Sequence, residues 1–160
     1  MRALIVVLVS CLGLGVVPAL GQDGKEALLG ARTVTEAVVA PWSGDAGEGS
    51  ALQASRLLNS VVVFGPRVIT ARDPQLTCGG VRYEATRLPP NSLFQSALPD
   101  FARDATLRSL GLPEGEVAGV DVGCSTGLYS YHFKDPLTVL LGFSNRIYVL
   151  RRKSTRSASR

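Results

Sequence analysis

The chain has very few of the side chains on which most enzymes and metal proteins depend. Its 160 residues include one histidine, His132, and three cysteines. Structural zinc sites use four thiolate or imidazole ligands, and catalytic zinc sites use three protein ligands. If Cys78 and Cys124 are bonded to each other, His132 is the one imidazole or thiolate ligand left in the domain, which is too few for either kind of zinc site. The sequence therefore predicts no metal site, and nothing in it indicates a cofactor.

Motifs that bind phosphate or calcium, or that activate a serine, are also missing. Gly79-Gly80 lacks the helix start and the lysine of a phosphate-binding loop. Glu114 and Glu116 flank a glycine in a turn, and they offer too few oxygen ligands for a calcium loop. No Gly-x-Ser-x-Gly nucleophile elbow is present. These absences argue against the common nucleotide-binding, calcium-binding and α/β-hydrolase classes.

Residues 1–21 have the pattern of a secretory signal peptide. Arg2 provides a positive charge, and an uncharged apolar run covers residues 3–17. Ala19-Leu20-Gly21 has small residues where a signal peptidase reads, so the mature chain would begin at Gln22. The alternatives are a membrane anchor and a lipoprotein acylated at Cys11. The apolar run is short for a membrane span. It also continues past Cys11, whereas the cysteine of a lipoprotein signal normally ends the apolar run. We therefore expect an extracytoplasmic protein, either periplasmic or secreted.

Residues 22–152 have the length of one β-rich domain, and they contain two cysteines, Cys78 and Cys124. An even pair in an exported chain usually forms a disulfide. We expect these two residues to lie in neighbouring strands and to be bonded to each other. The alternative is a pair of free buried thiols.

Short runs of β-branched and aromatic residues, separated by glycine and proline turns, predict a mainly β protein. The expected strands cover residues 32–39, 61–64, 67–71, 76–78, 81–86, 117–124, 128–133, 137–143 and 147–150. Short helices are expected over residues 25–29 and 50–58, and a third from Asp100 to a stop at Gly111. This spacing favours a small antiparallel β-barrel or a strongly curved meander. A β-sandwich and an open α+β sheet remain alternatives.

The order of these elements resembles the small exported calycin barrels, which include the lipocalin-like proteins. A short helix leads into a strand after Gly30, and a late hairpin ends next to Arg151, so the resemblance covers residues 26–152. Lipocalin-like proteins open with Gly-x-Trp, whereas this chain has Gly30-Ala31-Arg32, and its only tryptophan is Trp42. The chain also resembles bacterial inhibitors of lysozyme in being small, exported, β-rich and disulfide-bonded. The resemblance is architectural, and it implies no particular binding residue.

The strand over residues 128–133 carries the candidate site residues. Its alternation places the rings of Tyr129, Tyr131 and Phe133 on one face and Ser130 and His132 on the other. On a curled sheet the three rings either fill the core or line a ligand pocket. The sequence makes them the candidate pocket residues.

His132 is the candidate for general acid–base chemistry, because its ordinary pKa lies close to neutral pH. Ser130 on the same face would be the nucleophile. A triad also needs an orienting acid and an oxyanion hole, and the sequence provides no motif for either. We therefore expect His132 to face solvent or a polar rim, without a catalytic role, and its replacement by alanine to change stability little.

The positive net charge of +4 arises at the C-terminus. Five basic residues crowd the last ten positions: Arg151, Arg152, Lys153, Arg156 and Arg160. Residues 153–160 are expected to form a disordered, solvated tail, with contact to an anionic envelope surface as the alternative. Nucleic acid is not an expected partner of an exported protein.

These observations favour an exported, non-enzymatic binding protein of unknown ligand. It would be a carrier of a small apolar ligand or an inhibitor of an exported hydrolase. The alternatives are a structural envelope protein tethered by its basic tail and a hydrolase that uses His132.

Overall fold

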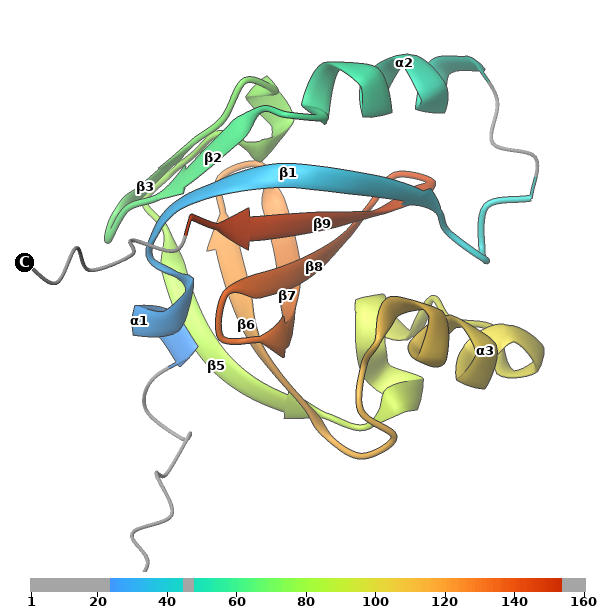
Figure 1. The fold of residues 1–160 in the computed structure, drawn as a ribbon. Coiled ribbons are helices and arrows are strands. Elements are labelled where there is room, and N and C mark those ends of the chain that lie inside the picture. Colours follow the sequence, from blue (N-terminus) through green and yellow to red (C-terminus); the bar gives the residue numbers. More distant parts are fainter. Residues whose placement is uncertain (1–23, 45–47, 154–160) are drawn as a thin grey trace, which may run out of the picture.

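An antiparallel sheet of nine strands curls strongly on itself in the computed structural model, which describes residues 24–44 and 48–153 (Figure 1). The strands are β1 (Gly30–Val39), β2 (Val61–Phe64), β3 (Val68–Thr70), β4 (Cys78–Gly79), β5 (Arg82–Leu88), β6 (Val117–Cys124), β7 (Gly127–Asp135), β8 (Thr138–Phe143) and β9 (Arg146–Arg152). The helices are α1 (Gly24–Leu28), α2 (Glu48–Leu57) and α3 (Asp100–Leu110), with 3-10 segments η1 (Pro74–Leu76) and η2 (Pro90–Ser96). The predicted mainly β fold, with a strongly curved antiparallel sheet and short helices, is confirmed.

The strand order is β4-β3-β2-β1-β9-β8-β7-β6-β5. Consecutive strands pair from β1 to β4 and from β5 to β9, and β1 also pairs with β9, so the first and last strands lie side by side. Among these nine strands, β4 and β5 are the one consecutive pair without a hydrogen-bonded ladder. The sheet is therefore a nearly closed cycle with a single seam between β4 and β5.

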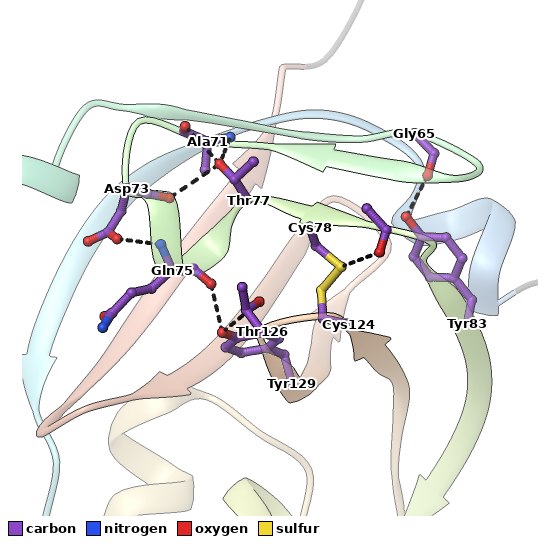
Figure 2. The surroundings of a disulfide bond; sticks show 11 residues. Gly65, Ala71, Asp73, Gln75, Thr77, Cys78, Tyr83, Cys124, Thr126 and Tyr129 are labelled. Carbon is purple, nitrogen blue, oxygen red and sulfur yellow. Dashed lines mark hydrogen bonds between the residues drawn. A yellow bond between two sulfur atoms is a disulfide. The ribbon is translucent and has the colours of Figure 1, made fainter.

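Covalent and polar contacts bridge this seam (Figure 2). Cys78 of β4 and Cys124 of β6 form a disulfide with a Cα–Cα distance of 5.5 Å. The Tyr83 hydroxyl of β5 donates a 2.6 Å hydrogen bond to the Gly65 carbonyl, which follows β2. The predicted cysteine pair is confirmed, but the expectation of neighbouring strands is wrong. The two cysteines lie near opposite ends of the strand order, and the curl of the sheet brings them together.

Apolar side chains fill the inner face of the curled sheet. Their buried members include Leu28, Val34, Leu57, Val62, Phe64, Ile69, Leu76, Val120, Val122, Tyr131, Val139, Leu141, Tyr148 and Leu150. The rings of Phe64 and Tyr131 meet edge to face, with centroids 5.0 Å apart. Residues from nearly every strand meet in this cluster, so it holds the curl together.

Two arginines attach α1 to the sheet. Arg32 of β1 is fully buried, and it donates 2.8 Å and 2.6 Å hydrogen bonds to the carbonyls of Leu137 and Ala27. Arg152 of β9 donates to the same Ala27 carbonyl at 2.7 Å. Burial, and then the positive charge of Arg152, lowers the pKa of Arg32 to about 10, so Arg32 stays charged at neutral pH. Arg152 is thus engaged in the fold, whereas Arg151 is exposed.

A second apolar cluster lies on the outer face of the sheet, where η2 and α3 cover it (Figure 1). It contains Ala40, Leu93, Phe94, Leu98, Leu107, Leu110, Leu112, Val117, Leu140, Ile147 and Val149. Helix α3 ends at Gly111, which adopts the left-handed conformation (φ 67°) that favours glycine, as predicted. The sheet between β6 and β9 is therefore covered on both faces.

No helix among residues 24–44 and 48–153 is long and apolar enough to cross a membrane. A disulfide is typical of proteins that work in an oxidising compartment. The predicted signal peptide (1–21), Cys11 and most of the predicted basic tail, including Arg156 and Arg160, lie outside the described residues.

Candidate functional site

The three aromatic residues of β7 lie on the inner face of the sheet. Tyr131 is 1% exposed, and burial raises the pKa of its phenol well above the ordinary value. Tyr129 and Phe133 are half-buried and pack against the same cluster. The Tyr129 hydroxyl donates a 2.7 Å hydrogen bond to the Gln75 carbonyl (Figure 2). A ligand pocket at these rings stays a prediction.

His132 lies on the outer face and is completely buried, so the expectation that it faces solvent is wrong. Its Nε2 accepts a 2.9 Å hydrogen bond from the backbone N–H of Phe94. The Phe94 ring meets the imidazole edge to face, with centroids 4.8 Å apart. Strand alternation shows which side chains share a face, but it cannot show that η2 covers that face.

The η2 segment that covers His132 has a strained backbone. Phe94, Gln95 and Ser96 are consecutive non-glycine residues in the left-handed region, with φ values of 52°, 59° and 61°. Each such residue costs about 1 kcal/mol or more. The hydrogen bond to His132 holds the first of them, and a 3.0 Å bond from Gln95 Nε2 to the Leu128 carbonyl holds the second. Strain of this kind concentrates at functional sites, so this segment marks a candidate site.

A shallow pocket of about 190 Å³ lies beside this segment, and we call it the Phe94 pocket. It is lined by Trp42, Phe94, Gln95, Ala97, Ser130, Gly142 and Ser144. The Trp42 and Phe94 rings lie 5.6 Å apart between centroids. They rest on Gly142, where a Cβ atom would come within 3.0 Å of Phe94 Cδ1. Because residue 142 is glycine, the rings of Trp42 and Phe94 can pack directly against the backbone there and line the pocket.

Three buried polar atoms on the same face have no hydrogen-bond partner among the described residues: Thr86 Oγ1, Asp121 Oδ1 and His132 Nδ1. Gly119 separates β5 from β7 at this point. A Cβ atom there would lie 2.9 Å from Thr86 Oγ1 and 3.4 Å from His132 Nδ1. The absence of a side chain at Gly119 thus lets polar groups from the two flanking strands approach each other across β6.

This environment decides the protonation of His132. Burial lowers its pKa to about 4, and the negative charge of Asp121 only partly opposes that shift. At neutral pH the imidazole is uncharged, and because Nε2 accepts from Phe94, the proton is on Nδ1. No hydrogen bond joins His132 to Ser130 or to Asp121. The geometry therefore does not pair a nucleophile with a base.

The substitution Gly119→Ala tests the close packing over β6. The added methyl group would lie 2.8 Å from the backbone oxygen of Tyr131, so we expect a loss of about 1–3 kcal/mol in the free energy of unfolding. Urea denaturation measures it. Gly123→Ala is the matched control on the same strand, because its nearest contact would be 3.9 Å. Equal stability of the two variants would contradict the expectation.

A further depression, which we call the α3 groove, lies over the outer face of β1 and β9 next to α3. Its volume is about 230 Å³. It is lined by Glu36, Val38, Val39, Pro41, Thr106, Ser109, Leu110, Lys134, Thr138, Ile147, Val149 and Arg151. Leu110, Ile147 and Val149 are buried, whereas Val38 and Val39 are 38% and 52% exposed. Sequence reasoning missed this groove, for which the adjacent valines at the end of β1 were the one available signal.

No family model, curated protein or solved structure matches this chain.

Proposed function

We propose that this is an exported, non-enzymatic binding protein that holds a small, mostly apolar ligand in the α3 groove. The observation that carries the proposal is the groove in which the exposed side chains of Val38 and Val39 lie beside the buried Leu110, Ile147 and Val149. Small-molecule sites are typically concave and mainly apolar, with a few polar groups at defined places. Exposed large apolar side chains at such a surface are typical of binding sites.

The surroundings of His132 support a non-enzymatic role. Its imidazole is fully enclosed, and Nε2, the nitrogen that accepts hydrogen bonds, is occupied by the Phe94 amide. A general base must reach the proton that it removes, directly or through one water molecule. His132 would need the η2 segment to move before it met a substrate.

Filling the groove tests this proposal. Ser109 lines the groove on α3, so Ser109→Trp should abolish the binding of 1-octanol, a neutral apolar probe. Titration followed by amide NMR shifts should place the unmodified protein's response at residues 36–41, 106–110 and 147–151. Ala105→Trp is the matched control, because Ala105 is exposed on the same helix and does not line the groove.

Retention of the same response by Ser109→Trp would contradict the groove as the ligand site. A response confined to the Phe94 pocket or to the rings of β7 would do so as well, and it would move the site there.

A further inference from the structure

Three polar side chains stand in a row at one end of the α3 groove. Thr138 of β8 pairs with Arg151 of β9 and with Asp135 of β7, and Lys134 is the extra residue at the register shift between Phe133 and Asp135. Thr138, Arg151 and Lys134 all line the groove. A cation, a hydroxyl and a second cation therefore lie on three adjacent strands.

The groove changes from apolar to cationic along β9. Ile147, Val149 and Arg151 are the residues of this strand that line it, in that order. On β1 the exposed Val38 pairs with Ile147, so the apolar end has side chains from both strands. A ligand lying along β9 would meet apolar surface first and positive charge last.

The two cations at this end of the groove are exposed and available to a ligand. Within residues 24–44 and 48–153, neither Lys134 nor Arg151 forms an ion pair. Thr138 is 2% exposed, and its hydroxyl has no hydrogen-bond partner in that part of the chain. Lys134 is exposed, and its Nζ lies close to Gly111, the residue that ends α3, since a Cβ atom there would be 2.9 Å away.

One acid, Glu36, also lines the groove. Glu36 pairs with Val149, which lies two residues before Arg151 on β9. It forms no ion pair with Lys134 or Arg151. Two cations and one acid leave a single positive charge in the lining. This charge complements a ligand that carries one negative charge.

Building on the proposed function, we propose that the ligand is a single-chain amphiphile with a carboxylate head. The carboxylate lies between Lys134 and Arg151 and accepts a hydrogen bond from the Thr138 hydroxyl. The chain lies over Val149 and Ile147. Hydrogen bonds from cations to a carboxylate are among the strongest in proteins, so the head group contributes most of the discrimination.

The test compares octanoate with 1-octanol, which has the same chain length and no charge. Both are titrated below the concentration at which they aggregate, at pH 7.5, with amide NMR shifts as the readout. Octanoate should bind about tenfold tighter or more, as expected for hydrogen bonds to charged groups. In the double variant Lys134→Met and Arg151→Met, the two probes should bind equally.

Two further variants sharpen the comparison. Glu36→Gln should strengthen octanoate binding severalfold and so raise the preference for octanoate over 1-octanol, because it removes the one acid of the lining. The double variant Arg67→Met and Arg72→Met removes the same net charge from exposed positions outside the groove. It should bind both probes as the unmodified protein does.

The outcomes separate the two proposals. Equal binding of both probes at the groove would overturn the carboxylate class and leave the binding function in place. Binding of neither probe would overturn both. Loss of the octanoate preference in the Arg67 and Arg72 control would show attraction by net charge alone and would also overturn the carboxylate site.

Discussion

Replacing both Cys78 and Cys124 with serine should lower the free energy of unfolding by about 4 kcal/mol. The disulfide closes a loop of 46 residues, and a loop of that length restricts the unfolded chain by about this amount. The loss is a large share of the stability of a typical domain. It falls on the seam between β4 and β5, where no strand ladder replaces the covalent link.

Urea denaturation of the double serine variant measures this loss. Tyr83→Phe is the comparison variant, because it removes the hydrogen bond to Gly65 across the same seam and should cost only about 1 kcal/mol. Hydrogen exchange should show the greatest loss of protection in β4 and β5. A double serine variant as stable as the unmodified protein would show that the curl of the sheet closes the seam without the disulfide.

Acidification should destabilise the protein through His132. Its pKa is about 4 in the folded state, against an ordinary value of 6.5, so the unfolded chain binds the proton more tightly. The stabilisation is therefore complete above about pH 6.5 and is lost as the pH falls towards 4. The difference corresponds to ~3 kcal/mol, and below pH 4 this group causes no further loss.

Two measurements isolate this effect from the titration of the acids. His132 is the one histidine of the chain, so the pH dependence of its NMR signal reports its pKa directly. Between pH 7 and pH 4 the free energy of unfolding should fall less in His132→Gln than in the unmodified protein. Glutamine keeps an acceptor for the Phe94 amide but has no group that titrates. A histidine signal that titrates near pH 6.5 would contradict the buried, neutral imidazole.

His132→Ala should lower the free energy of unfolding at pH 7 by about 3 kcal/mol. It leaves the buried Phe94 amide without an acceptor and opens a cavity beneath η2. This reverses the small effect that the sequence alone predicted. Unfolding in urea measures it, and a loss below about 1 kcal/mol would mean that η2 holds its strained conformation without the histidine.

The sequence by itself determined the local elements. The strand over residues 117–124 has the predicted bounds, the Gly65-Pro66 turn joins β2 to β3, and Gly111 ends α3. Each of these features depends on residues close together in the chain: β-branched alternation, a turn dipeptide, or a glycine at a left-handed position. The pairing of Cys78 with Cys124 also followed, because an even pair of cysteines leaves no other partner within the domain.

Tertiary structure alone decided what covers each face. Ser130, His132 and Lys134 form a polar alternation that predicts a solvated face, yet η2 buries His132. No local signal predicts that cover, because Phe94, Gln95 and Ser96 hold left-handed conformations without a glycine, through contacts with β7. The α3 groove has the same origin. Its lining joins β1, α3 and β9, which are far apart in the chain, and only the pairing of β1 with β9 and the packing of α3 bring them together.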